Sequence, residues 1–324
     1  MRSSIPLFAL VVVVSAIAAL APWAGSAPSG LPPVSRFTDA TTAQGHSNPT
    51  WCPDGSKIAF EDRDTDPSNP SLDYKGYPSG TETILADPHR ESVAYSADCT
   101  QIAYAKLDGV WTHIYIRSAS GGAETAITSG TAGPSFSGYG DWQPSFSPDG
   151  QWIAFSSSRG DLLYGKYDVW VVKTDGTGLK KIAVGGNDAS FWPAWEPGGN
   201  AVVYSFNANL YRVPRISASS WGSSVLYAAN GNHPRFSHDG NWLAFDFAKD
   251  IYVMNYATKT RTAITSDGAT SEDYAPTWGP NDDEIAFSSN NRGGDANTAI
   301  WIATGIQAVP TVPVTLGRLK DQYR

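Results

Sequence analysis

The stretch Gln143-Pro144-Ser145-Phe146-Ser147-Pro148-Asp149-Gly150-Gln151-Trp152-Ile153-Ala154-Phe155 has the pattern of a strand, a tight turn and a second strand. Its centre, residues 147–150, is typical of a turn: Pro fixes φ at the second position, Asp suits the third, and Gly accepts a positive φ at the fourth. Apolar and aromatic residues flank the turn on both sides, as a β-hairpin requires. We therefore expect Gly150 to have a positive φ.

This hairpin occurs six times along the chain. The counterparts of Pro148 are Pro53, Ala97, Pro197, His238 and Pro280, which places the six anchors 44, 51, 49, 41 and 42 residues apart. An aromatic residue lies two positions before each anchor: Trp51, Tyr95, Phe146, Trp195, Phe236 and Trp278. Another lies seven positions after it: Phe60, Tyr104, Phe155, Tyr204, Phe245 and Phe287. A fixed unit with connections of variable length, at a period of about 40–50 residues, indicates the blades of a β-propeller.

Each unit continues with two further apolar segments, so the sequence predicts an all-β fold: a six-bladed β-propeller with four antiparallel strands per blade. Third strands are expected at Leu72, Ile114, Val169, Leu210, Ile251 and Ile300. Two segments, 36–39 and 314–316, compete for the outermost strand of the sixth blade. Phe37 lies 12 residues before Pro49, as Ile264 lies 12 before Pro276, and this spacing favours closure of the ring by residues 36–39.

The repeated units resemble those of a known family. Pro-Thr-Trp-Cys-Pro-Asp-Gly at 49–55 and Pro-Ser-Phe-Ser-Pro-Asp-Gly at 144–150, each followed by Ile-Ala-Phe, are similar to the WD40-like Pro-Asp (PD40) repeats of TolB-type six-bladed β-propellers. The resemblance covers residues 36–317. Too few residues precede the first repeat for the N-terminal α/β domain of TolB, so the resemblance implies the fold and not a role in the Tol–Pal envelope system.

The N-terminus has the pattern of a secretory signal peptide: Arg2, an apolar run from Ile5 to Ala24, and small residues ending at Ala27. The alternative is an uncleaved anchor, because the apolar run is nearly long enough to cross a bilayer. We expect residues 1–27 to be the signal peptide, 28–35 a linker, 36–317 the propeller and 318–324 a C-terminal tail. A secreted or periplasmic location follows, with no membrane insertion after cleavage.

The mature chain is acidic. The sequence has 23 basic and 31 acidic residues, so removal of Arg2 leaves 22 against 31 and a net charge of −9. This charge argues against nucleic acid and anionic membrane surfaces as partners, and permits cations, basic proteins or neutral glycans. We expect a monomer.

The two cysteines, Cys52 and Cys99, lie in equivalent turns of neighbouring repeats. An even count in an exported protein favours a disulfide between them, and the alternative is two separate small core residues. The alternating carboxylates Asp62, Asp64 and Asp66 are a candidate calcium loop, with a solvated acidic loop as the alternative.

Three histidines, His46, His89 and His233, lie in blade-to-blade loops that should surround the central channel. Converging neutral imidazoles could bind a transition metal, but their spacing is irregular, and ordinary loop histidines are the alternative.

The loops divide unequally between the two faces of the ring. Turns between first and second strands are uniform, whereas residues 61–70, 128–143, 156–168 and 288–298 are long loops of neighbouring blades on the opposite face. Sites concentrate on such loops, with neutral length drift as the alternative. The candidate ligand-binding residues precede the inner strands on this face, where we expect them at the surface of the channel mouth; they are Asp141, Trp142, Trp192, Asn232, His233, Asp273 and Tyr274. They could equally cap strands and neighbouring backbone.

Catalytic signatures are mostly absent: the sequence has no Gly-x-Ser-x-Gly, no Walker loop and no Cys-x-x-Cys. Paired carboxylates could support glycoside chemistry, but acidic loops are too common for this to be specific. The sequence therefore favours a binding module, with protein as the expected ligand and glycan as the other. The alternatives are a carbohydrate-active lyase or glycoside hydrolase with its site at the channel mouth, and a structural envelope component.

Overall fold

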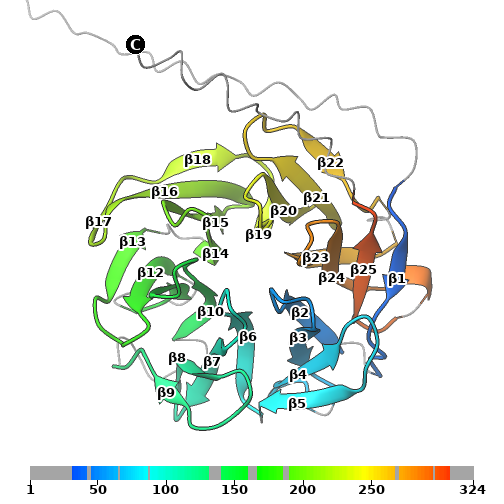
Figure 1. The fold of residues 1–324 in the computed structure, drawn as a ribbon, viewed down its shortest axis with the longest axis horizontal. Helices are drawn as coiled ribbons and strands as arrows, with labels where there is room; N and C mark the ends of the chain where they lie inside the picture. Colours follow the sequence, from blue (N-terminus) through cyan, green and yellow to red (C-terminus); the bar gives the residue numbers. More distant parts are fainter. Residues whose placement is uncertain are drawn as a thin grey trace, which may run out of the picture.

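The computed structural model describes residues 31–41, 45–64, 66–86, 88–130, 140–159, 166–184, 190–266, 270–294 and 296–306. Six antiparallel sheets stand round a central axis like the blades of a propeller (Figure 1). The predicted fold, a six-bladed all-β propeller with four strands per blade, is confirmed. In the part of the chain that the structure describes, no helix has the length and apolar character needed to cross a bilayer.

In blades 1 to 5 the strands run outward from the axis in chain order. Blade 1 contains β2 (His46–Trp51), β3 (Lys57–Asp62), β4 (Ser71–Gly76) and β5 (Glu82–Ala86). Blade 2 contains β6 (Arg90–Tyr95), β7 (Gln101–Asp108), β8 (Trp111–Ser118) and β9 (Thr125–Ala126). Blade 3 contains β10 (Asp141–Phe146), β11 (Trp152–Ser157), β12 (Asp168–Lys173) and β13 (Lys180–Ala183).

The second half of the ring follows the same order, with two additions. Blade 4 contains β14 (Ser190–Trp195), β15 (Ala201–Phe206), β16 (Asn209–Ser217) and β18 (Val225–Ala228), plus the short β17 (Ser220–Trp221), which pairs with the end of β16. Blade 5 contains β19 (Asn232–Phe236), β20 (Trp242–Phe247), β21 (Asp250–Asn255) and β22 (Arg261–Ala263). Blade 6 contains β23 (Glu272–Trp278), β24 (Glu284–Asn290) and β25 (Ala299–Thr304), with the 3-10 turn η1 (Arg292–Gly294) between the last two.

The periodic aromatic residues form the core. All six residues found seven positions after the anchors are at most 2% exposed. They belong to six apolar clusters, and each cluster joins two neighbouring blades. Large rings fill the wedge between adjacent sheets, because the sheets diverge away from the axis. The core is therefore distributed over the six blade interfaces.

The N-terminal segment closes the ring. Strand β1 (Val34–Arg36) pairs antiparallel with β25 as the outermost strand of blade 6, with Val34 opposite Ala303 and Arg36 opposite Trp301 (Figure 1). Closure by the N-terminal side is confirmed, but the strand begins two residues before the predicted segment 36–39. The chain then continues inward, where the amides of Phe37 and Thr38 both donate to the Ile300 carbonyl. The competing segment 314–316 lies outside the described residues.

The Pro-Asp-Gly turns have the predicted geometry. Gly150 has φ +66° and its amide donates to the Ser147 carbonyl at 2.9 Å. Where blade 3 has Gly150, blade 2 has Cys99, also at a positive φ of 58°. The structure contains the Cys52–Cys99 disulfide, with Cα atoms 5.7 Å apart, which joins the turns of blades 1 and 2.

Candidate functional site

Each inner strand is interrupted by a β-bulge near the axis. The pairing of each inner strand with the second strand of its blade shifts register at the same place, five residues before the anchor. The residues there all have a positive φ between 48° and 58°: Asn48, Ser92, Gln143, Trp192, His233 and Ala275. A bulge re-aims the local backbone and side chain. The repeat therefore places six irregular backbone positions in one ring around the axis.

Side chains of the preceding blade hold several of these bulges. The Asn48 amide donates to Ser288 Oγ at 2.9 Å, and the Ser92 amide donates to Glu61 Oε1 at 2.9 Å. The Ala275 amide donates to Asp246 Oδ1 at 3.1 Å. Each acceptor lies on the second strand of the preceding blade, one residue after its buried aromatic. These contacts fix the shape of the ring's centre, because they satisfy amides that the bulges remove from the ladder.

The centre of the ring contains a small pocket lined by one or more residues of each inner strand. We call it the central pocket; its lining includes Asn48, Ser92, Gln143, Trp192, Arg235 and Ala275. Its cavity volume is about 10 Å³, which is about the space of one water molecule.

Arg235 is the charged group of the central pocket. It lies three residues before the blade 5 anchor, where the other blades have Thr50, Ala94, Ser145, Ala194 and Thr277. Its guanidinium donates to the Pro234 carbonyl at 2.9 Å and lies 5.8 Å from the centroid of the Trp192 ring. Among the described residues, no acidic side chain forms an ion pair with it, and burial lowers the pKa of Arg235 to about 10. The Arg235 side chain is half-buried, and a partly desolvated cation without a protein carboxylate is a candidate site for an anion.

Three of the predicted ligand-binding residues lie together beside this pocket. The rings of Trp192 and His233 are in edge contact at 4.5 Å, and those of His233 and Tyr274 lie 6.3 Å apart. His233 Nδ1 is 2.5 Å from Asp246 Oδ1. Burial, with the charge of Glu61 adding to it, raises the pKa of Tyr274 to about 12. Asn232 begins the same strand as His233 and lies opposite Asp246 in the ladder.

The expectation that Asp141 and Asp273 are surface residues is wrong. Both are 1% exposed. Asp141 accepts from Ser157 Oγ at 2.5 Å and pairs with Arg159 at 2.5 Å. Asp273 has the same partners in blade 6, Ser289 and Arg292. Burial favours neutral carboxyls, so both carboxylates need these cations, and their geometry is that of a structural cap on a loop.

Trp142 is half-buried, and its ring packs edge-on against Tyr167 at 5.3 Å. The adjoining loop segments 131–139 and 160–165 lie outside the described residues.

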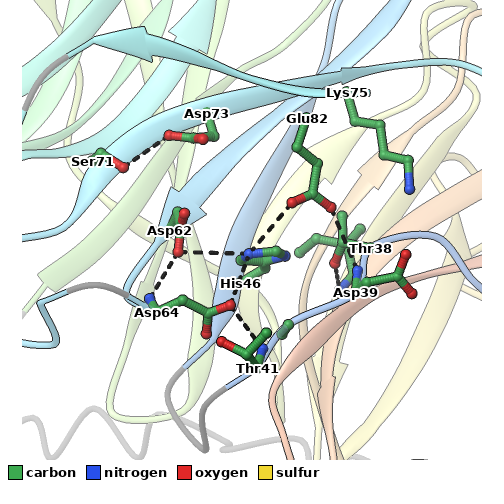
Figure 2. A network of polar contacts seen from close by, with 12 residues as sticks. Thr38, Asp39, Thr41, His46, Asp62, Asp64, Ser71, Asp73, Lys75 and Glu82 are labelled. Carbon is green, nitrogen blue, oxygen red and sulfur yellow. Dashed lines mark hydrogen bonds and ion pairs between the residues drawn. The ribbon is translucent and has the colours of Figure 1, made fainter. Parts of the chain in front are cut away.

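The structure groups the candidate metal ligands differently from both predictions, the three-histidine site and the calcium loop. Among the described residues, the clusters with metal-ligand spacing do not join His46, His89 and His233. Asp66 is also separate from Asp62 and Asp64, because its carboxylate accepts from the Ser68 amide and the Asn69 side chain. The structure instead places His46 with Asp62 and Asp64, as Figure 2 shows. One residue of the predicted histidine site and two of the predicted calcium loop therefore form a single cluster.

Comparison with known proteins supports the fold assignment. No family model matches the chain. An uncharacterized protein of Agrobacterium fabrum, Atu1656, is 31% identical over 168 residues, which are 47% of this chain and 52% of that protein. The Tol-Pal system protein TolB of Francisella tularensis is 26% identical over 234 residues, 68% of this chain and 50% of that protein. The chain thus spans about half the length of the curated relatives it matches.

Solved structures agree at the level of fold. TolB from Acinetobacter baumannii superposes with a TM-score of 0.57 at 19% identity, covering 77% of this chain and 64% of that one. The chain is a six-bladed β-propeller that is similar to TolB proteins. An oligogalacturonate lyase in complex with manganese superposes with a TM-score of 0.52 at 15% identity, covering 86% and 95%. At these identities the solved structures show a shared fold and leave the chemistry open.

Sequence reasoning missed two features of this TolB-like propeller. Arg235 was overlooked, although alignment of the six repeats shows it as the charged residue at a position that is otherwise small. Glu82, from the outer strand β5, was missed as a neighbour of His46. No local sequence pattern predicts that a residue of an outermost strand, such as Glu82, lies near the first residue of an inner strand, such as His46.

Proposed function

We propose that the chain is a secreted or periplasmic TolB-like module that binds a protein, and that the partner places an anionic group against Arg235 in the central pocket. The observation that carries this proposal is the half-buried guanidinium of Arg235, which lines the central pocket without an acidic partner among the described residues. A carboxylate at a chain end or on an acidic side chain has the matching charge and a geometry that accepts two guanidinium N–H groups.

The recognition of such a group would be local. The mature chain is acidic overall, with 22 basic and 31 acidic residues after removal of Arg2, so its long-range field does not attract anions. An anionic group would bind through desolvated contact with Arg235 and the neighbouring Trp192 ring. A binding constant with little dependence on ionic strength follows, because enclosed charge pairs are screened weakly.

The size of the central pocket favours a protein segment over a sugar substrate. A cavity of about 10 Å³ is too small to enclose a pyranose ring, and an anionic group of a protein would reach Arg235 from the mouth of the pocket. The similarity to TolB proteins supports the same class of function, and a periplasmic or secreted location is proposed from that similarity and from the signal-peptide pattern of residues 1–27. Glycan ligands and a carbohydrate-active role find less support in this geometry.

The test is a matched peptide screen. An array of peptides with free C-terminal carboxylates is compared with the same peptides amidated, and the hits are measured by isothermal titration calorimetry. Charge-assisted hydrogen bonds contribute about 1.5–3 kcal/mol, so Arg235→Gln should weaken free-acid peptides by about 10- to 100-fold.

Lys180→Gln is the control, because Lys180 is exposed on the outermost strand of blade 3. It removes one positive charge without touching the central pocket and should bind as wild type does. Hits that bind Arg235→Gln normally, or amidated peptides that bind as well as free acids, would overturn the proposed function.

A further inference from the structure

A second site lies off the axis, where blade 1 meets the segment that closes the ring. His46 is the first residue of β2, and Asp62, its cross-strand partner, is the last of β3. Asp64 follows two residues later, and Glu82 begins β5. The chain that leaves β1 passes over them: the Thr41 amide donates to Asp64 Oδ2 at 2.7 Å (Figure 2).

His46 is buried and has no hydrogen-bonded ring nitrogen among the described contacts. Its side chain is 2% exposed and packs on the Phe60 ring at 4.7 Å. Nδ1 is enclosed without a hydrogen-bond partner. Nε2 points between three carboxylates, with Asp62 Oδ1 and Asp64 Oδ2 at 3.6 Å and Glu82 Oε2 at 3.9 Å. These separations are too long for hydrogen bonds, and a buried imidazole normally has a partner.

The separations fit ligands around a shared cation. The donor atoms of His46, Asp62 and Asp64 all lie within 4.8 Å of one another. Two atoms bound to one zinc ion at about 2.0–2.2 Å lie about 3.3 Å apart in a tetrahedron. The observed distances of 3.6 Å therefore need a contraction of a few tenths of an ångström, which rotation of carboxylate side chains supplies.

The charge balance points the same way. Among the described residues, Asp62 and Glu82 form ion pairs with His46 and with no Lys or Arg. The nearby Lys75 ammonium is directed elsewhere: it donates to the Phe37 carbonyl at 2.7 Å. Asp73 adds a further carboxyl next to the cluster (Figure 2), and burial raises its pKa, with repulsion from Asp62 and Glu82 adding to the effect. Asp62 and Glu82 thus face the imidazole without a cationic side chain among the described residues, and a divalent cation would neutralise their charge.

The chemical type of the ligand atoms, one imidazole nitrogen with carboxylate oxygens, indicates which class of metal ion the cluster would bind. Calcium and magnesium prefer oxygen ligands alone, whereas imidazole suits the transition metals, and carboxylates suit manganese. One nitrogen with carboxylate oxygens therefore matches manganese or zinc better than calcium. We propose that His46, Asp62 and Asp64, with Glu82 at the edge of the cluster, bind one divalent transition-metal ion, manganese or zinc, at the junction of blade 1 with the ring-closing segment.

The position gives such an ion a structural consequence. Asp64 accepts from the Thr41 amide, and Glu82 lies 3.4 Å from the Asp39 amide. Both amides belong to the chain that follows β1, the strand that completes blade 6. An ion that holds the two carboxylates also holds this chain against blade 1. Metal binding should therefore stabilise the closure of the ring.

The experiment uses tag-free protein that has been treated with a chelator and dialysed. Manganese, zinc and calcium are titrated separately, the bound ion is counted by elemental analysis, and Tm is followed by calorimetry. The expected result is one manganese or zinc ion per chain, bound more tightly than calcium, with a rise in Tm of several degrees.

The variants locate the site. His46→Gln and Glu82→Gln should each weaken binding by at least 10-fold; Glu82 lies at the edge of the cluster, so its replacement keeps the test valid if His46→Gln unfolds. Asp66→Asn and His238→Gln are the matched controls, because both side chains lie outside the cluster, and both should bind as wild type does. Absence of a stoichiometric ion, equal binding by Glu82→Gln, tighter calcium binding, or loss of binding on Asp66→Asn would overturn the proposal.

Discussion

In blade 3 the inner strand begins with Asp141, whose carboxylate pairs with Arg159 at 2.5 Å, whereas blade 1 has His46 at the same place, facing Asp62 and Asp64. Both positions lie seven residues before the anchor, and Asp62 corresponds to Ser157, the hydroxyl donor to Asp141. Blade 6 repeats the blade 3 arrangement. In blades 1, 3 and 6 the repeat thus provides an enclosed polar position before the anchor, and the residues placed there decide how its charge is balanced.

The difference distinguishes a carboxylate that is neutralised by an ion pair within its own chain from carboxylates that face an imidazole. In blade 3, burial acts to raise the pKa of Asp141, but the contacts with His113, Arg159 and Ser157 outweigh it and lower the pKa. That carboxylate is neutralised by its own chain. In blade 1 no Arg takes the place of Arg159, and the carboxylates gather round an imidazole instead. A search for ligand sites should therefore look for the blade in which a histidine, and not an arginine, faces the carboxylates.

The largest expected effect on stability comes from breaking the buried ion pair between Asp141 and Arg159. Asp141→Ala leaves Arg159 enclosed without its carboxylate, and breaking a buried pair costs about 3–5 kcal/mol. Urea unfolding followed by tryptophan fluorescence measures this cost. Asp66→Ala is the control, since Asp66 is exposed and a surface change costs within about 0.5 kcal/mol. A cost below about 1 kcal/mol for Asp141→Ala would show that the pair is not structural.

The next effect comes from giving blade 1 the residues of blade 3. The triple variant His46→Asp, Asp62→Ser, Asp64→Arg gives blade 1 the Asp, Ser and Arg arrangement of blade 3. It should fold, with the circular dichroism of wild type, and its Tm should no longer change when manganese or zinc is added. A triple variant that keeps the metal-induced rise in Tm would place the metal elsewhere.

A substitution at Gly150, on the opposite face of blade 3, provides a reference value for the cost of backbone strain. Gly150 has φ +66°, and no atom lies within 4 Å of the place that a Cβ would take, so substitution there tests backbone strain alone. Gly150→Val should lower the free energy of unfolding by about 1–2 kcal/mol, because a β-branched residue resists positive φ. Gly150→Asn should cost less. An unchanged urea midpoint for Gly150→Val would contradict the strain argument.

The smallest effect concerns pH. Burial raises the pKa of Asp73 in the folded protein, so the folded state binds the proton more tightly than the unfolded chain does. The contribution of Asp73 to the free energy of unfolding therefore increases as pH falls from the pKa of the folded state to that of the unfolded chain. At pH 7 the ionised Asp73 carboxylate destabilises the folded protein. Asp73→Asn should modestly stabilise the metal-free protein at pH 7 and have a smaller effect near pH 4. Asp141 should behave oppositely, since its lowered pKa contributes stability that is lost on acidification. Destabilisation by Asp73→Asn that is greatest at pH 7 would contradict this sign.

The fold could be predicted because its signals are local and repeated. The aromatic residues at fixed offsets indicated the core, and the 12-residue spacing before Pro49 indicated closure by the N-terminal segment. The register of β1 could not be predicted, because hydrophobic spacing locates a strand without specifying which residue lies opposite Trp301.

The site was predicted only in part, because its geometry depends on pairs distant in sequence. Asp141 lies at the start of an inner strand, where a ligand-binding residue was expected, but its carboxylate is buried against Arg159 from another part of the chain. Trp192 and His233 were expected at the centre and lie there, whereas Arg235 was hidden by its place inside a strand. Side-chain direction at a β-bulge is not encoded in the alternating pattern of a regular strand.

The most direct test of the contrast between blades 1 and 3 is the anomalous diffraction of a crystal soaked in manganese. The account predicts one strong anomalous peak per chain, within about 2.0–2.3 Å of His46 Nε2 and of the Asp62 and Asp64 carboxylates, and no peak at Asp141 or Asp273. A peak at the Asp66 loop or in the central pocket, or no ordered peak in blade 1, would contradict it.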